Sequence, residues 1–380
     1  MTPFRIDIDE AVLERIRRRL LDAWWAATPD DDAEWTYGTD AKWLRSFVDY
    51  WTSTYDWRAA ERELNRWPQY RATVGGQDIH FHHVKGSASR ARPLLLTHGW
   101  PGSVVEFQSC IERLAFPGRH GGDPETGFDL VIPSLPGYGF SARPKRPVGP
   151  RAVANLWRSL MVDELGYREF VAQGGDWGAA VTSWLGIDHA DVTKAIHLNM
   201  LPSWVFAPAE RPEPGEAEYH ARVAAVRARE MGYFAVQSTK PQTIALALTD
   251  SPLGFAAWVC EKFRSWGDTH GDIDSRFSRD ALITNLMLYL VNDAVGPAMW
   301  MYRGRAEESP PGATVPRVEV PTGVACFPAE FVPYPPRAVA ERAYAVERWT
   351  AMQAGGHFAA LEEPAAFSDE VRAFFSQVRF

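Results

Sequence analysis

The sequence predicts an α/β fold in which helices flank a mostly parallel central sheet. Short apolar runs such as 94–96 and 128–132 have the composition of strands that are buried on both faces. Amphipathic stretches at helical spacing, such as 152–165, separate these runs. Because strands alternate with helices, we expect parallel strands joined by right-handed crossovers.

The first 90 residues (1–90) predict a helical arm followed by the first strands. Residues 10–66 are rich in tryptophan, and their apolar residues recur at helical spacing. From Tyr70 the period changes to two, which predicts strands at 70–74 and 78–84. The Gly75-Gly76 pair between them predicts a hairpin turn.

Residues 91–201 predict the first part of the core, and residues 305–380 the second. Strands are expected at 94–96, 128–132, 170–173, 195–198 and 322–327, with helices at 152–165, 181–186 and 364–375. Residues 202–304 are mostly helical and rich in aromatic residues, so they interrupt the alternation. We expect this insertion to cover the active site as a lid.

The composition restricts the class of protein. Of the 380 residues, 46% are hydrophobic and 23% are charged, which is ordinary for a globular protein. The net charge of −8 argues against nucleic acid as a partner, because phosphate binding requires a basic surface. The first residues lack an apolar signal core and no apolar run approaches about 18 residues, so no membrane association is expected.

Cysteine and tryptophan usage add two further expectations. The three cysteines, Cys110, Cys260 and Cys326, form neither a disulfide framework nor a metal-binding spacing, which predicts a reduced cytoplasmic protein without a metal. The 16 tryptophans suit an apolar pocket for a small molecule.

The run 174–178 (GGDWG) has the pattern of a nucleophile elbow with Asp176 at its centre. Glycines on both sides allow a sharp turn from strand to helix that exposes the central side chain. A carboxylate is already anionic near neutral pH, and it can attack a saturated carbon to form an alkyl ester. The alternative is a glycine-rich turn with a helix-capping aspartate. We expect Asp176 to be the nucleophile.

The run 98–103 (HGWPGS) follows an early strand, where this architecture supplies a second oxyanion-binding amide. The first such amide belongs to the residue after the nucleophile. The predicted donors are therefore the backbone N–H groups of Trp100 and Trp177. Their indoles are also expected to line the substrate pocket.

A histidine near the C-terminus and an acid before it complete the predicted catalytic set. His357 lies in a glycine-rich turn, expected after one helix and before the last one, where the general base belongs. Glu330 follows the strand at 322–327 and is expected to orient His357. His357 would then activate a water that hydrolyses the ester on Asp176.

Other acids near His357 are predicted to have different roles. Glu341 and Glu347 lie in a helical pattern and are expected to face solvent. Glu362 and Glu363 follow His357 closely and are expected to place negative charge at the start of the last helix.

Together these features resemble the microsomal-type epoxide hydrolases, a branch of the α/β-hydrolase superfamily with an extra N-terminal region. The resemblance runs from about residue 4 to the end. The matching stretches are 98–103, 133–141, 174–178, 237–241, 250–254, 327–330 and 355–360. It implies the α/β-hydrolase fold and a cofactor-free conversion of an epoxide to a vicinal diol through a covalent ester on Asp176.

The resemblance also assigns two lid tyrosines, Tyr233 and Tyr302, as donors of hydrogen bonds to the epoxide oxygen. Phenols suit this role because they can stabilise an alkoxide leaving group without attacking the carbon. Animal members of the family carry an N-terminal membrane anchor, whereas this chain begins almost directly with the soluble region. The resemblance therefore implies a soluble, bacterial-type enzyme.

Two other functions are compatible with parts of the sequence. A haloalkane dehalogenase shares the fold, the aspartate and the histidine, and it uses indole N–H groups such as those of Trp100 and Trp177 to hold the halide. A catalytically silent member of the fold would bind a ligand only, but such proteins usually lose a catalytic residue.

The expected partner is a small-molecule epoxide, bulky and apolar or aryl, because the lid is rich in aromatic residues. The resemblance is compatible with both detoxification and natural-product biosynthesis. A homodimer is compatible with the sequence, although no residue pattern requires one.

Overall fold

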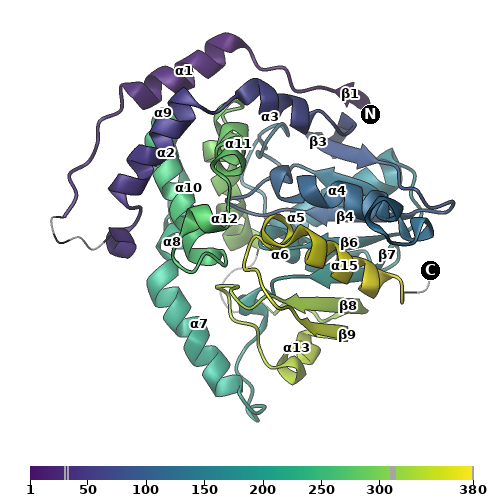
Figure 1. The fold of residues 1–380 in the computed structure, drawn as a ribbon. Coiled ribbons are helices and arrows are strands. Elements are labelled where there is room, and N and C mark those ends of the chain that lie inside the picture. Colours follow the sequence, from purple (N-terminus) through teal and green to yellow (C-terminus); the bar gives the residue numbers. More distant parts are fainter. Residues whose placement is uncertain (30, 32–33, 309–313, 379–380) are drawn as a thin grey trace.

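The computed structural model describes residues 1–29, 31, 34–308 and 314–378. Within these residues, nine strands form one sheet in the order β1-β2-β3-β5-β4-β6-β7-β8-β9 (Figure 1). The first three, β1 (Thr2–Phe4), β2 (Gln69–Val74) and β3 (Gln77–Val84), are antiparallel to their neighbours. The others run parallel: β4 (Arg92–Thr97), β5 (Phe128–Pro133), β6 (Phe170–Gly174), β7 (Thr193–Leu198), β8 (Val318–Cys326) and β9 (Tyr344–Ala351). The predicted α/β fold with a mostly parallel sheet is confirmed.

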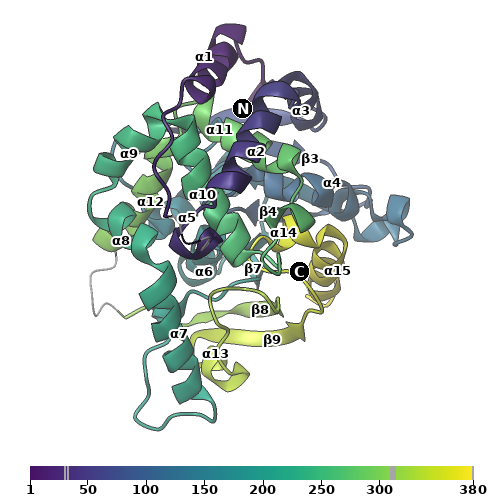
Figure 2. The same ribbon diagram turned by 60° about the vertical axis from the view of Figure 1, so that its left-hand side comes forward.

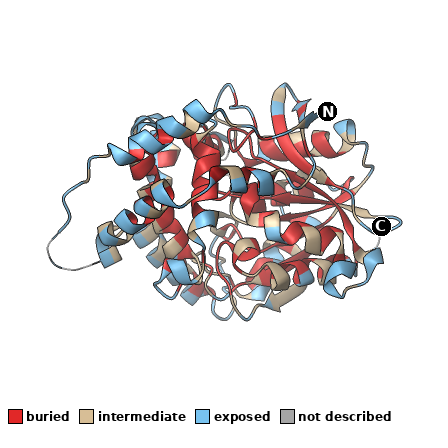
Figure 3. Cartoon of the chain, turned by 45° about the horizontal axis from the view of Figure 1, so that its top comes forward, coloured by how far each residue is buried: buried red, intermediate tan, exposed pale blue. Residues whose placement is uncertain are grey.

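Helices cover both faces of the parallel strands (Figures 1 and 2). On one face α4 (Gln108–Ala115) packs against α15 (Pro364–Phe375), and on the other α5 (Pro150–Ser159) packs against α6 (Trp177–Asp188). Adjacent residues of β7 face these two layers, because His197 contacts Phe374 of α15 whereas Ile196 lies beside Gly186 of α6. Burial on both faces explains the continuous apolar runs of these strands (Figure 3).

The lid (202–304) enters after β7 and leads back to β8, so its first residues lie at the carboxyl edge of the parallel strands. Its helices are α7 (Glu216–Glu230), α8 (Gly232–Thr239), α9 (Pro241–Asp250), α10 (Pro252–Trp266), α11 (Arg279–Leu290) and α12 (Val295–Glu308), and α12 continues past the predicted boundary at residue 304. Helix α12 packs on α8, α9 and α5, which ties the lid to the core. Among the described helices, no single one is long and apolar enough to cross a membrane, although α9 and α10, bent by 115°, pass that test as a pair.

The arm (10–66) packs on the outside of the lid. Its helices are α1 (Glu10–Leu21), α2 (Ala41–Ser53) and α3 (Trp57–Leu64). Each begins after an aspartate that accepts a hydrogen bond from the first turn, namely Asp9, Asp40 and Asp56. The arm contacts α10 and α11, and the hydroxyls of Tyr55 and Thr284 lie 2.9 Å apart at this boundary.

The segment before His357 differs from the prediction. Glu341 lies in the short helix α13 (Arg337–Ala343), as expected, but Glu347 lies in strand β9. His357 therefore follows a strand, and the helix α14 (Ala359–Glu362) separates it from α15. Residues 344–351 pair with β8, and this long-range pairing outweighs the weak helical spacing of the local sequence.

Helix α7 is fastened to the core at its N-terminal end. Arg342 of α13 donates two hydrogen bonds of 2.9 Å to the carboxylate of Glu216, whose side chain is 1% exposed. These hydrogen bonds lower the pKa of Glu216 to about 2, from an ordinary value of 4.5. Figures 1 and 2 both show α7 running from the lid toward α13.

We expect the substitution Glu216→Gln to lower the unfolding temperature by roughly 2 °C or more, because it leaves one side of the arginine fork without a charged partner. The folded-state pKa is depressed, so the stabilisation is complete above pH 4.5 and is lost as the pH falls toward 2. The difference from the wild type should thus be equal at pH 7 and pH 5.5 in thermal unfolding. Glu213→Gln is the control, since Glu213 is 3.7 Å from Arg342 and 43% exposed; an equal loss in the control would refute the prediction.

Candidate active site

Asp176 lies at the turn between β6 and α6, as the elbow motif predicts. Its φ of 48° and ψ of −124° place it outside the regions that residues with a side chain favour. Such a conformation costs about 1–3 kcal/mol and persists only where the surrounding structure holds it. Gly178 permits the turn, because a Cβ atom there would lie 1.9 Å from the carbonyl oxygen of Thr97. The turn therefore presents the carboxylate at the carboxyl edge of the sheet.

The two oxygens of Asp176 face different groups. The backbone N–H of Trp100 donates a hydrogen bond of 2.8 Å to Oδ1. On the other side, Oδ2 lies 3.4 Å from Nε2 of His357. The loop 98–103 thus brings the Trp100 amide to the carboxylate, as expected for an oxyanion donor. The Trp177 amide, at the first position of α6, stays a predicted second donor.

His357 lies between two carboxylates. Its Nδ1 is 2.9 Å and 3.0 Å from the two oxygens of Glu330, which fixes the ring with Nε2 toward Asp176. Nε2 is buried and has no hydrogen bond to the described residues. Burial lowers the pKa of His357, but Glu330 and Asp176 outweigh it, so the pKa is raised well above its ordinary value. While Asp176 is ionised, the imidazole therefore favours its protonated form.

The lid brings Tyr233 of α8 and Tyr302 of α12 to the same cavity as Asp176. Their ring centroids are 5.8 Å apart, and the Tyr302 ring meets the Trp177 ring edge to face at 4.7 Å. Burial raises the pKa of both phenols well above 10, so both hydroxyls keep their protons at neutral pH. The Tyr302 hydroxyl has no hydrogen-bond partner within the described chain.

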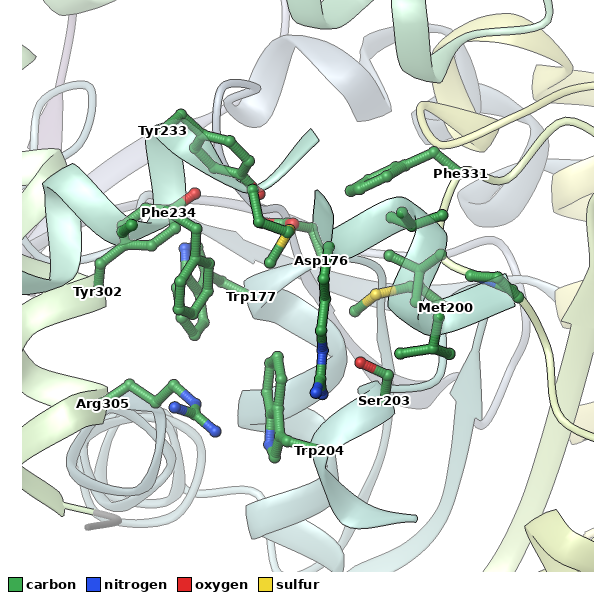
Figure 4. A pocket seen from close by; sticks show the side chains of 17 residues that line it. Asp176, Trp177, Met200, Ser203, Trp204, Tyr233, Phe234, Tyr302, Arg305 and Phe331 are labelled. Atoms are coloured by element: carbon green, nitrogen blue, oxygen red, sulfur yellow. The ribbon is translucent and has the colours of Figure 1, made fainter. Parts of the chain in front are cut away.

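The cavity above Asp176 has a volume of about 330 Å³ and a mainly apolar wall (Figure 4). Met200 and Phe331 face it from one side, and Phe234 and Tyr302 face it from the other. Trp177 lines the cavity, as predicted. Trp100 does not line it, which corrects the expectation for its indole, because its ring stacks behind Tyr233 at a centroid distance of 5.0 Å.

Comparisons with known proteins agree with this arrangement. Residues 1–107 match the model of the epoxide hydrolase N terminus, and residues 92–229 match that of the alpha/beta hydrolase fold. A protein of Stigmatella aurantiaca is 39% identical over 100% of this chain and 86% of its own length, and Epoxide hydrolase 1 of Sus scrofa is 32% identical over 98% and 88%. The chain belongs to the epoxide hydrolase family.

Solved structures of epoxide hydrolases have the same fold over nearly the whole enzyme. The Aspergillus niger epoxide hydrolase superposes with a TM-score of 0.87 at 30% identity, covering 100% of this chain and 96% of that one. The juvenile hormone epoxide hydrolase of the silkworm Bombyx mori gives 0.85 at 31% identity, covering 99% and 93%. The α/β-hydrolase fold implied by the sequence motifs is thereby confirmed.

Glu362 holds the loop that carries His357, a role that the sequence did not predict. Its buried carboxylate accepts hydrogen bonds from the backbone N–H groups of Asp268 (2.7 Å), Gly356 (3.0 Å) and Phe358 (2.9 Å). The expected role as helix N-terminal charge is therefore wrong for Glu362. Glu363 does precede α15, but its carboxylate pairs with Arg276 at 2.6 Å and does not cap the helix.

The loop 98–103 of the enzyme is held by hydrogen bonds to the core and to the lid. His98 is neutral, because burial lowers its pKa to about 4, and its Nε2 accepts a hydrogen bond of 3.2 Å from the Leu135 amide. From the lid, Asn285 donates a hydrogen bond of 2.8 Å to the carbonyl of Pro101, and the Tyr289 hydroxyl donates one to Gly102. These contacts fix the position of the Trp100 amide.

Glu106 is a further acid that the sequence analysis missed. Burial raises its pKa to about 8, partly offset by His357. Its carboxyl packs against Gly102, where an added Cβ would meet Oε1 at 1.7 Å. The segment 98–107 thus contributes a buried carboxylic acid whose uncharged form is favoured by burial.

We expect Glu362→Gln to lower the kcat for diol formation at least tenfold with a smaller change in KM. The amide nitrogen would face backbone N–H groups that need an acceptor, which costs about 1–3 kcal/mol and loosens the His357 loop. Steady-state kinetics with styrene oxide measure this effect. Glu363→Gln is the matched control, and equal losses in the two variants would show that the Glu362 hydrogen bonds do not position His357.

Proposed function

We propose that the enzyme opens its epoxide by attack of Asp176 on a ring carbon. Oδ2 forms the new C–O bond while the ring C–O bond breaks, and Oδ1 stays with the Trp100 amide as the carbonyl oxygen of the ester. Tyr233 and Tyr302 donate to the ring oxygen, and one of them gives it a proton. The product is a hydroxyalkyl ester on Asp176. The position of both phenols in the Asp176 cavity carries this proposal.

The second step hydrolyses the ester. Once Asp176 is esterified, it has no charge, so the pKa of His357 falls. The imidazolium gives its proton to the tyrosinate left by the first step, and the neutral imidazole becomes a base. Its Nε2 takes a proton from water, and the hydroxide attacks the ester carbonyl while the amides of Trp100 and Trp177 stabilise the oxyanion. The diol oxygen leaves with the proton of the added hydroxyl, which restores the Asp176 carboxylate beside the His357 imidazolium. Glu330 holds the imidazolium in place during this step.

The substrate that we propose is a bulky, apolar or aryl epoxide. A cavity of about 330 Å³ lined by Met200, Phe234 and Phe331 favours an apolar body next to the reacting ring. The cytoplasmic location and the homodimer stay predictions from the sequence.

Dehalogenation is the second candidate, and one observation favours it. The indole nitrogens of Trp100 and Trp177 are buried without hydrogen-bond partners within the described residues. Of these, only Trp177 lines the cavity, so a halide would meet one indole. Two phenols in the same cavity favour an alkoxide leaving group instead.

The function is tested by product analysis. We expect diol from styrene oxide and no halide ion from 1-bromohexane, with all turnover lost in Asp176→Ala. The variant His357→Gln should accumulate the ester, visible as a mass increase equal to that of the epoxide, because no base activates the water. Halide release without diol would establish the dehalogenase, and turnover of His357→Gln without an adduct would contradict the covalent route.

The role of the tyrosines is tested by removing their hydroxyls. Tyr233→Phe and Tyr302→Phe should each lower kcat/KM about 10- to 100-fold, because one phenol still donates to the oxygen. The double variant should lose far more than either single change. Tyr219→Phe is the control, since Tyr219 is a buried tyrosine of α7 that does not line the cavity. Full activity of the double variant would remove both phenols from the mechanism.

A further inference from the structure

Two arginines line the same cavity as the nucleophile. Arg227 projects from α7 and Arg305 from α12, and both contribute to the wall that contains Asp176. Figure 4 shows Arg305 and Trp204 at one end of the cavity, with Asp176 and Tyr233 toward the other. The wall between these ends is mainly apolar, so the two arginines place positive charge in a mainly apolar cavity.

The guanidinium of Arg305 forms no ion pair with a carboxylate in the part of the chain that the structure describes. It lies 4.3 Å from the centroid of the Trp204 ring, and its Nε atom is buried with no hydrogen-bond partner in the described chain. Burial lowers the pKa of Arg305, and the nearby charge of Arg227 lowers it further. Keeping two like charges close together in a partly buried wall is unfavourable unless an anion joins them.

The two acids that follow Arg305 in α12 are engaged elsewhere. Glu307 pairs with Arg303 at 2.7 Å on the outer side of α12. Glu308 accepts hydrogen bonds from the backbone amides of Gly149, Arg151 and Ala152. Within the described residues, no carboxylate forms an ion pair with Arg227 or Arg305, so the pair is available to an anion that enters the cavity.

We propose that Arg227 and Arg305 form a carboxylate subsite, and that the enzyme acts on epoxides that carry an anionic group at the end of an apolar segment. The epoxide ring would lie at Asp176, the apolar segment along Phe234 and Trp204, and the carboxylate between the two guanidinium groups. Guanidinium groups donate paired hydrogen bonds that match a carboxylate, which suits them to this role. This inference rests on the proposed function of the site.

The kinetic test compares 10,11-epoxyundecanoate with its methyl ester, which has the same chain and epoxide but no charge. In the wild type, kcat/KM for the acid should exceed that for the ester by about tenfold or more, as expected for charge-assisted hydrogen bonds. The ratio should fall as NaCl is raised, since Arg227 is exposed at the rim. The ratio is measured within each enzyme, so a general loss of activity does not affect it.

The variants assign the preference to the two arginines. Arg305→Gln and Arg227→Gln should each reduce the acid-to-ester ratio several-fold, and the double variant should abolish the preference. Arg303→Gln is the control, because Arg303 lies two residues from Arg305 on the same helix but pairs with Glu307 and does not line the cavity. Arg227 is exposed on α7, so its replacement keeps the test informative if Arg305→Gln does not fold.

A binding measurement separates this inference from the reaction itself. Calorimetry with 4-phenylbutanoate and 4-phenylbutanamide should give tighter binding of the acid, by about tenfold, and the difference should shrink in Arg227→Gln and vanish in the double variant. If no epoxide is hydrolysed, the proposed function is wrong. The calorimetric comparison of acid and amide still tests the carboxylate subsite in that case. Equal affinities for acid and amide in the wild type, or a preference that survives both replacements, would overturn the subsite.

Discussion

The rest of the site depends on the electrostatic coupling between Asp176 and His357. Nε2 of His357 lies 3.4 Å from one carboxylate, while Nδ1 contacts the other, Glu330, so two negative charges favour one imidazolium. The Trp100 amide and the positive end of α6 offset the remaining charge of Asp176. In the proposed mechanism, esterification of Asp176 removes one of the two charges. The attack by Asp176 would thereby convert His357 into the base that the next step requires.

This coupling requires precise positions, and residues far from the reaction supply them. The amide that contacts Asp176 belongs to the loop 98–103, whose carbonyls accept hydrogen bonds from Asn285 and Tyr289 of α11. Helix α11 in turn contacts α2 and α3 of the arm, where Tyr55 contacts Thr284. The arm therefore supports the helix that holds the loop 98–103, although its residues do not line the cavity.

Most of the sheet and the central residues of the candidate site could be located from the sequence, because their signals are local. Asp176 is marked by the glycines around it, and the apolar runs mark strands buried on both faces. The role of Glu362 in holding the His357 loop could not be predicted, because it depends on a hydrogen bond from the Asp268 amide, which is 94 positions away in the chain. Strand β9 was missed because the pairing with β8 determines its structure, and Trp100 was misplaced because only the packed lid shows that its ring stacks behind Tyr233.

The cavity is electrostatically polarised, and this decides how a charged substrate could lie in it. Asp176 repels an anionic group from the reacting end, whereas Arg227 and Arg305 attract it to the other end. Both effects act in the same direction along a mainly apolar wall. An anionic epoxide would therefore bind in one orientation before any contact with the tyrosines forms. A neutral epoxide of the same length has no such constraint, so charge, more than shape, would distinguish the two orientations.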